Sequence, residues 1–336
     1  MNSLLSVSGR SLLAASALAA CASGAYAQSS VTAYGILSVD GVYASNVASG
    51  GEYRLENGRL NPSRLGFKGS EDLGGGLAAV FDIESGINPD TGTTQGAFWN
   101  RGAYVGLSSK SLGTLTFGRQ WNVNDDLLGD FFIFGGYAVF SYDGFGFTSD
   151  TLNNAAKYVS PSWGGFSIEA MGALGEGGPR TAEVGLSYKA GPFKAVLTYH
   201  QAEQVDVAKD KLVSAGVSYS FSGYNARLAY SSADNQLSGT GTPGKPKAAV
   251  YDIGFDAPLG AVASASLDYV ARDLKDSDAD SAFIRLLLKY NLSKRTLLTA
   301  NLIYMKNDDG ASQSFYGLKA VGDSQTVVGA GISHSF

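Results

Sequence analysis

The sequence predicts an all-β fold, a transmembrane antiparallel β-barrel of about sixteen strands with one long loop folded inward. Three observations support this prediction. From residue 30 to residue 336, apolar and polar side chains alternate with a period of two, which places successive side chains on opposite faces of a strand. No segment shows a sustained helical stripe. Short and long turns separate the runs, and the chain ends on an aromatic residue.

The first residues have the pattern of a secretory signal peptide. Arg10 supplies the positive charge, the residues after it form a short apolar core, and Ala25-Tyr26-Ala27 is an A-x-A cleavage site. We therefore expect a signal peptide over residues 1–27 that is cleaved after Ala27. A cleavage box of the lipoprotein type is the alternative, and it would leave Cys21 lipidated.

The rest of the chain, residues 28–336, is predicted to be one barrel domain, because no linker interrupts the alternation. The whole chain has 44 glycines, 18 tyrosines and 17 phenylalanines, and only 16% of its residues are charged. This composition suits a sheet with aromatic belts better than a disordered chain. Beyond the signal peptide, no segment reaches the roughly 20 apolar residues that a spanning helix needs, which excludes an α-helical membrane protein.

Charge and cysteine content exclude further classes. The chain has 25 basic and 30 acidic residues, and this acidic balance disfavours nucleic acid as a partner. Cys21 is its one cysteine, so a chain cleaved after Ala27 has no disulfide and no thiolate metal site. We expect no cofactor and no bound metal.

The predicted strands have two faces of different chemistry, as one of the later runs illustrates. Ala265, Leu267 and Tyr269 share one face, while Ser266 and Asp268 share the other. A sheet that spans lipid must pair its first strand with its last, since each unpaired backbone group in hydrocarbon costs several kcal/mol. We therefore expect a closed wall that is apolar outside and encloses a water-filled lumen.

Seven short turns join fourteen strands, and one run at each end of the chain brings the predicted number to sixteen, with eighteen as the alternative. The short turns are residues 73–76, 111–113, 162–165, 190–192, 222–223, 258–260 and 292–294. The connections between them are longer and polar. Short turns at one rim and long loops at the other are typical of outer-membrane barrels. Aromatic side chains cluster near the short turns, where a strand is expected to leave lipid.

One long connection, residues 122–154, differs from the others. It carries Phe131-Phe132-Ile133-Phe134 and further phenylalanines, and loops of this length are usually functional or disordered. Its aromatic side chains need a place to pack. We therefore expect this connection to fold inward and to narrow the lumen.

Six segments of the chain resemble the trimeric general-diffusion porins of Gram-negative outer membranes, in particular the β-proteobacterial type. They are residues 30–35 (SVTAYG), 63–76 (SRLGFKGSEDLGGG), 100–107 (NRGAYVGL), 117–120 (FGRQ), 153–161 (NNAAKYVSP) and 331–336 (GISHSF). The resemblance covers the whole chain after the signal peptide. It implies a homotrimer in the outer membrane that contacts lipid and lipopolysaccharide, and a constriction formed by the third long loop. It also implies that the terminal Phe336 is recognised by the outer-membrane assembly machinery.

In this family, basic residues on the wall face acidic residues on the loop. The resemblance places Arg64 and Arg101 at two of the wall positions. Parity supports Arg64 and adds Lys68, since Leu65 and Phe67 take the lipid face, whereas parity is ambiguous for Arg101. The candidate loop residues are Asp125, Asp126, Asp130 and Asp143.

The chain departs from the family pattern at one place. A third wall arginine is expected just before Asn153-Asn154, where this chain has Thr151-Leu152. The departure weakens the expectation of a strong anion preference.

These features predict passive diffusion of small hydrophilic solutes and ions, which align with the charges across a narrow neck. A substrate-specific outer-membrane channel is one alternative. A barrel hydrolase is another, because parity directs His200 inward and places Ser187 and Ser214 on the neighbouring strands. A nucleophile needs a base and an orienting group, however, and the sequence has no such local signature. We therefore expect no enzyme activity.

Overall fold

The computed structural model describes residues 30–336 except 133–149, 177–179, 204–209, 235–246, 276, 309, 312, 316–317 and 319. The predicted signal peptide lies outside the described residues. No helix in the described part combines the length and the apolar character that crossing a membrane requires.

Regular structure in the described part consists almost entirely of strands. They are β1 (Ser30–Ser45), β2 (Gly51–Asn57), β3 (Arg64–Gly74), β4 (Leu77–Asn88), β5 (Thr93–Thr94), β6 (Gly102–Ser109), β7 (Gly113–Trp121), β8 (Thr151–Val159), β9 (Phe166–Ala173), β10 (Arg180–Ala190), β11 (Phe193–Glu203), β12 (Asp210–Phe221), β13 (Tyr224–Asp234), β14 (Lys247–Pro258), β15 (Ala263–Leu274), β16 (Ser281–Asn291), β17 (Thr296–Asn307) and β18 (Ser324–Ser335). The described helix is α2 (Val123–Leu128).

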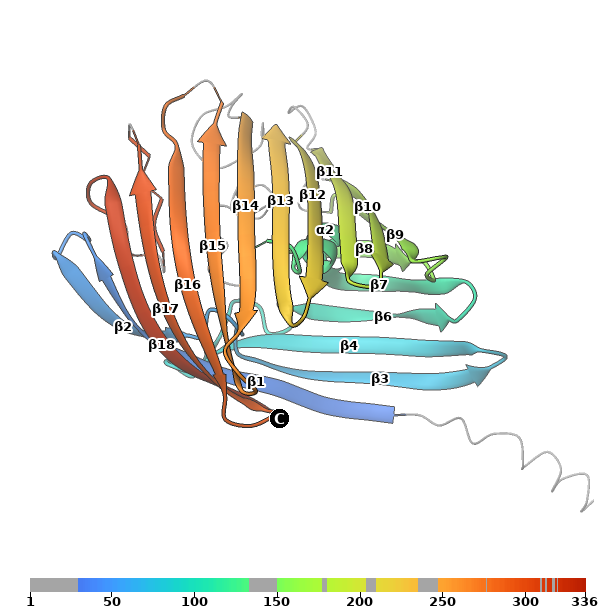
Figure 1. Ribbon diagram of the computed structural model, residues 1–336. Coiled ribbons are helices and arrows are strands. Elements are labelled where there is room, and N and C mark those ends of the chain that lie inside the picture. The colour runs from blue at the N-terminus through green and yellow to red at the C-terminus, as the bar shows by residue number, and fades with distance from the viewer. Residues whose placement is uncertain are drawn as a thin grey trace, which may run out of the picture.

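The strands close into one antiparallel ring (Figure 1), in which β1 pairs with β18 on one side and with β2 and β3 on the other. β2 and β3 share one position in the wall, because β1 pairs with β2 along residues 39–45 and with β3 along residues 30–36. β5 pairs with β4 apart from the ring. For the described part of the chain, the prediction of a closed barrel of sixteen wall strands is therefore confirmed.

The two ends of the barrel domain meet at the seam between β1 and β18. The Gly35 amide donates a hydrogen bond to the Phe336 carbonyl (3.2 Å), and the Phe336 amide donates one to the Gly35 carbonyl (3.0 Å). The final residue thus takes part in closing the ring. Closure removes the open edge that a sheet in hydrocarbon cannot tolerate.

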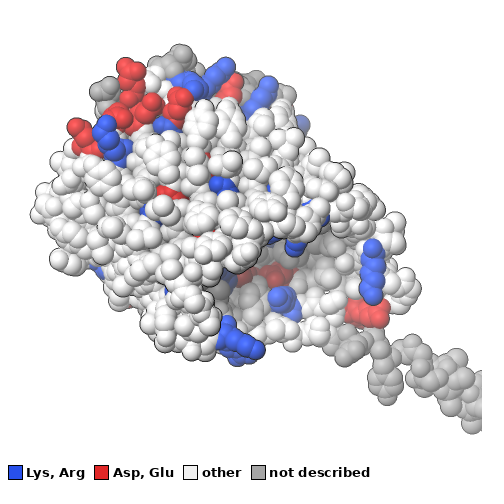
Figure 2. All heavy atoms as spheres, in the orientation of Figure 1, with Lys and Arg blue, Asp and Glu red and all other residues white. Residues whose placement is uncertain are grey.

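The predicted alternation between an outer and an inner face is confirmed. In β14, Ile253 is 54% exposed and the adjacent Asp252 is 1% exposed, and in β15 Leu267 is 49% exposed beside a fully buried Asp268. Figure 2 shows the consequence: the visible outer wall carries few charged side chains, which gather toward the rim and inside a hollow. The seven predicted short turns all lie between consecutive wall strands.

Aromatic side chains lie beside the short turns, as predicted. The ring of Tyr188 lies between those of Phe166 and Phe193, with centroids 4.4 and 6.3 Å apart. Phe221 and Tyr224 stack at 5.6 Å across the turn between β12 and β13. Amphipathic rings favour the boundary between lipid and water, so these pairs mark where the strands leave the hydrocarbon.

The inner face is less uniformly polar than the alternation predicts. Val270, Phe283 and Ile303 face inward, are at most 1% exposed, and share one apolar cluster with Phe132 and Phe315. The rings of Phe283 and Phe315 meet edge to face with centroids 5.1 Å apart. The prediction of a polar inner face is wrong around Phe283 and Phe315, because apolar side chains of the inward-folded connections cover the wall there.

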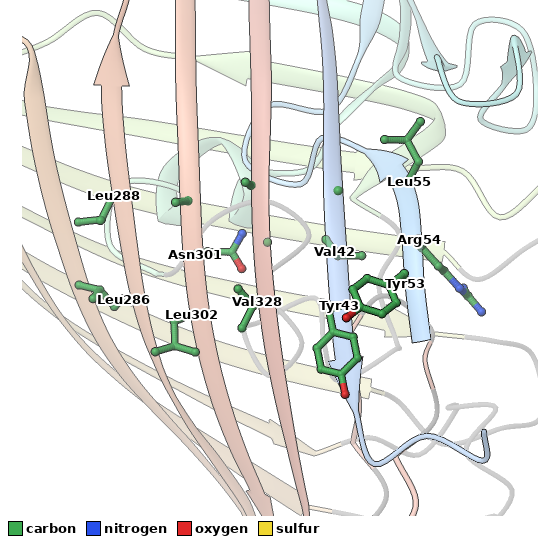
Figure 3. A pocket seen from close by; sticks show the side chains of 14 residues that line it. Val42, Tyr43, Tyr53, Arg54, Leu55, Leu286, Leu288, Asn301, Leu302 and Val328 are labelled. Atoms are coloured by element: carbon green, nitrogen blue, oxygen red, sulfur yellow. The ribbon is translucent and has the colours of Figure 1, made fainter. Parts of the chain in front are cut away.

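One groove of about 770 Å³ interrupts the outer face beside Tyr43 of β1 and Tyr53 of β2 (Figure 3). The two tyrosine rings lie 4.7 Å apart. The remaining lining comes mainly from small and aliphatic residues, among them Gly41, Leu55, Leu286, Leu288, Ala300, Leu302, Val328 and Ala330. The groove therefore continues the apolar outer surface.

Candidate pore constriction

The long connection between β7 and β8 enters the barrel, where α2 lies inside the curve of the wall (Figure 1). Asn122 caps the helix by accepting a hydrogen bond from the Asp125 amide (2.7 Å), and its own amide donates to the Asp150 carbonyl (2.8 Å). The two ends of the connection therefore meet. Burial raises the pKa of the Asp150 carboxyl, and Arg101 partly opposes this shift.

The connection is shorter than predicted and contains a helix that the alternation did not indicate. Residues 151–154 belong to β8, because Thr151 and Leu152 pair with Trp121 and Gln120 of β7. A helix of only six residues is too short to produce a periodic stripe in the sequence.

Two glycines in the wall make room for the connection. A Cβ at Gly185 of β10 would collide with the Leu127 side chain and lie 2.8 Å from a Val123 methyl group. A Cβ at Gly216 of β12 would lie 2.5 Å from the ring of Phe131. Any larger side chain at these positions would displace α2 or Phe131, so the sequence of the wall and the path of the loop are matched.

Arg101 turns inward although strand parity points the other way. Val105 in β6 is 59% exposed, so an unbroken strand would also direct residue 101 outward. β6 begins only at Gly102, so Arg101 lies before the regular strand. Its amide donates to the Glu84 carbonyl (3.2 Å), and its Nε donates to Glu84 Oε1 (2.5 Å). Its guanidinium lies 4.6 Å from the centroid of the Trp121 ring.

Arg64 lies within electrostatic range of Arg101, Glu84 and Asp125. The structure thus brings the two predicted wall arginines and one predicted loop carboxylate into the same region. Among the described residues, Arg64 donates from Nε to the Pro62 carbonyl (3.1 Å) and has no carboxylate in direct contact.

The other loop acids meet lysines rather than the predicted arginines. Asp126 forms an ion pair with Lys157 of β8, and Asp130 forms one with Lys194 of β11 (2.6 Å). The sequence places both lysines on polar faces of their runs, but nothing local connects them to a loop from elsewhere in the chain. Asp143 lies outside the described residues.

Lys68 lies next to residues of the two strands that flank β3. Its Nζ lies 5.0 Å from the centroid of the Tyr34 ring, and the Tyr34 hydroxyl donates to Asp82 (3.1 Å). Lys68 and Asp82 are register partners on β3 and β4. The lysine is therefore balanced by a wall carboxylate near it.

An unpredicted arginine reaches Thr151 and Asn153, beside the position where the resemblance predicts a third wall arginine. Arg119 of β7 donates hydrogen bonds to Thr151 Oγ1 and Asn153 Oδ1, both at 2.6 Å, and to the Asn100 carbonyl (2.6 Å). A register shift between Gly118 and Gln120 interrupts the alternation at this point. Period-two reasoning does not detect such a bulge, although Arg119 lies in one of the segments that carry the family resemblance.

The residues considered for a hydrolase have other partners. His200 Nδ1 lies 2.6 Å from Glu183 Oε1, the Ser187 hydroxyl is hydrogen-bonded to that of Ser167 (2.6 Å), and the Ser214 hydroxyl to that of Ser231 (2.6 Å). Both serines thus belong to serine pairs across neighbouring strands.

Comparisons with known proteins agree with this architecture. The sequence pattern of the Gram-negative porin family matches residues 14–310. The chain is similar to outer membrane porin protein 32 of Delftia acidovorans, with 32% identity over 97% of this chain and 99% of that protein. It is also similar to an outer membrane porin protein of Bordetella pertussis, with 31% identity over 97% of this chain and 100% of that protein. A solved structure described as an anion-selective porin from Comamonas acidovorans matches with a TM-score of 0.78 and 29% identity, and covers 92% of this chain and 100% of that one.

Proposed function

Since the chain belongs to the family of Gram-negative porins, which are diffusion channels of the bacterial outer membrane, we propose that its constriction passes small hydrophilic solutes with a modest preference for anions. Transport of this kind is passive. It makes and breaks no covalent bond, so it requires no catalytic group and no cofactor.

One contrast between the charges near α2 carries the proposal. The loop carboxylates Asp126 and Asp130 are compensated by Lys157 and Lys194. Arg64, by comparison, has no carboxylate in direct contact among the described residues. A passing anion can therefore approach a guanidinium that has no carboxylate bonded to it in the described part of the chain, whereas a cation finds these two acids already paired.

The narrow neck is where such a charge matters. Two unit charges about 4 Å apart interact by about 1 kcal/mol in bulk water and by about 4 kcal/mol at an effective dielectric constant of about 20. In the wide mouths of the barrel, charges interact about as weakly as in bulk water. In the neck beside α2, the effective dielectric constant is lower and the interaction is stronger. The anion-selective Comamonas porin, 29% identical in sequence, supports the same direction of selectivity.

The double variant Arg64→Gln and Arg101→Gln tests the proposal. It removes the two predicted wall guanidiniums and leaves Glu84 without its ion-pair partner. We therefore expect the reversal potential across a planar bilayer with a salt gradient to move toward that of a cation-preferring pore. Arg54→Gln is the matched control, because Arg54 lies on β2 and is paired with Glu52 at an exposed site (2.6 Å). An unchanged reversal potential in the folded double variant would reject the role of the wall arginines.

We further propose that the functional unit is a homotrimer in which each chain has its own pore. Family membership supports this assembly. Bilayer recordings of the wild-type protein are expected to show closures in groups of three equal steps. Single closures of uniform size at every protein concentration would instead indicate that monomers form the channel.

The remaining proposals concern biogenesis. Residues 1–27 act as a cleaved signal peptide, as their sequence pattern suggests. Phe336, which is 51% exposed at the seam, is the residue that the outer-membrane assembly machinery recognises. Lipid and lipopolysaccharide then cover the apolar outer wall.

A further inference from the structure

A buried pair of side chains, Glu183 and His200, lies on the inner wall next to α2. The two residues are register partners on β10 and β11. Both side chains are only 1% exposed, and Glu183 Oε1 lies 2.6 Å from His200 Nδ1. The role proposed above for the constriction uses neither residue.

The second carboxylate oxygen of Glu183 connects the wall to the loop. Glu183 Oε2 accepts a hydrogen bond from the backbone amide of Val123, the first residue of α2 (2.6 Å). A buried carboxylate normally needs several partners. Here His200 satisfies one oxygen and orients the group, so that the other oxygen points at the start of the helix.

The pair lies between apolar neighbours on the flanking strands. The register neighbours are apolar, Met171 on β9 beside Glu183 and Leu212 on β12 beside His200. The titratable side chains on α2 are Asp125 and Asp126. A carboxylate placed between apolar neighbours is costly to bury, which suggests that it serves the contact it makes.

α2 depends on the wall for its position. A helix of six residues is far shorter than the length at which isolated helices become stable in water. Its apolar side chains pack on the wall, with Val123 beside Met171, Ala155 and Ala173 and Leu127 above Gly185. Asp126 also pairs with Lys157 at the half-exposed side of the helix. The hydrogen bond from the Val123 amide to Glu183 fixes where the helix begins along β10 and also holds it against the wall.

We propose that Glu183, oriented by His200, is the positioning residue that holds α2 in the lumen and so sets the width and steadiness of the pore. The inference rests on the proposal that α2 narrows the channel, but not on the direction of ion preference. When the anchor is absent, α2 moves between positions, and the open-channel current fluctuates.

Val123→Pro is the most selective test of the anchor. Proline has no amide hydrogen, so the bond to Glu183 is lost, while the first position of a helix is the one where proline is favoured. Asn122 already has the extended backbone that precedes a proline (φ −74°, ψ 165°). We expect a several-fold increase in open-channel current noise and closure at a lower voltage.

Val123→Ala is the matched control, because it shortens the same side chain and keeps the amide. Its noise and closure voltage should lie much closer to those of the wild type. Equal behaviour of the Pro and Ala variants would overturn the proposal, since packing and not the hydrogen bond would then hold the helix.

Variants of the carboxylate give an independent test. Glu183→Leu removes the acceptor and suits the apolar neighbours, so it should reproduce the noise of Val123→Pro. Glu183→Gln retains an acceptor oxygen and should give currents as steady as those of the wild type. A purely space-filling role of Glu183 would instead predict the same noise for the Gln and Leu variants. If Glu183→Leu does not give the heat-modifiable mobility of a folded barrel, the comparison of Val123→Pro with Val123→Ala decides. Reversal potentials are recorded in the same experiments. Current noise tests the anchoring of α2, whereas the reversal potential tests the anion preference, so the two proposals can fail independently.

Discussion

Removal of residues 123–149, with Asn122 joined to Asp150 through two glycines, is expected to raise the open-channel conductance about twofold or more, because a barrel of sixteen strands leaves a lumen that wall side chains cannot fill. α2 and Phe131 occupy that lumen against β10 and β12. The ends to be joined are already hydrogen-bonded, from the Asn122 amide to the Asp150 carbonyl (2.8 Å), so a short linker closes the gap without straining the wall.

Single-channel recording in a planar bilayer measures this change, and liposome swelling with sugars of graded size measures the accompanying rise in the size limit. Gly185→Leu provides a graded companion, because its side chain would occupy the place of Leu127 and displace α2 without removing it. A deletion variant that folds, yet retains the wild-type conductance and size limit, would show that the connection does not narrow the pore.

Replacement of Asp268 by alanine should lower the free energy of unfolding by about 3 to 5 kcal/mol, the usual result of removing one partner from a buried ion network. Asp268 is fully buried on β15. Its Oδ1 lies 2.7 Å from Arg227 Nη2, and its Oδ2 lies 2.7 Å from Arg285 Nη2. Alanine would leave both guanidiniums, which are 8% and 3% exposed, without their shared carboxylate.

Urea-induced unfolding in lipid vesicles, followed by tryptophan fluorescence, measures this loss. Asp308→Ala is the control, since Asp308 pairs with Lys306 at an exposed site (2.7 Å), and exposed pairs contribute about 0 to 1 kcal/mol. Similar losses in the two variants would mean that the network inside the wall contributes no more than a surface pair.

The sequence was most informative about properties that depend on neighbours two residues apart. Ile253 and Asp252 face lipid and lumen as the alternation predicts, because each side chain need only match one of two solvents. The short turns were equally predictable, since their residues are adjacent in the chain. The same parity placed Arg64 and Lys68 on the inner face.

The sequence was less informative wherever the backbone leaves the regular strand. Arg101 precedes the first residue of β6 and turns toward Glu84, and Arg119 lies at a register shift. In both cases period two no longer determines the direction of the side chain. The six-residue helix α2 has no periodic signal for the same reason.

Contacts across the lumen were beyond sequence reasoning. Asp126 and Asp130 were predicted to face the wall arginines, yet they pair with Lys157 and Lys194. The partner of a loop residue is decided by which distant strand the closed ring brings opposite it. The inner apolar cluster that joins Phe283 to Phe315 has the same origin.

By itself the sequence determined a closed barrel with an apolar exterior, since each strand position faces either lipid or water and its side chain matches that environment. Only the tertiary structure decided which charges meet in the neck and how α2 is held at Glu183. These pairings join residues far apart in the chain, and their geometry exists only after the last strand has closed on the first.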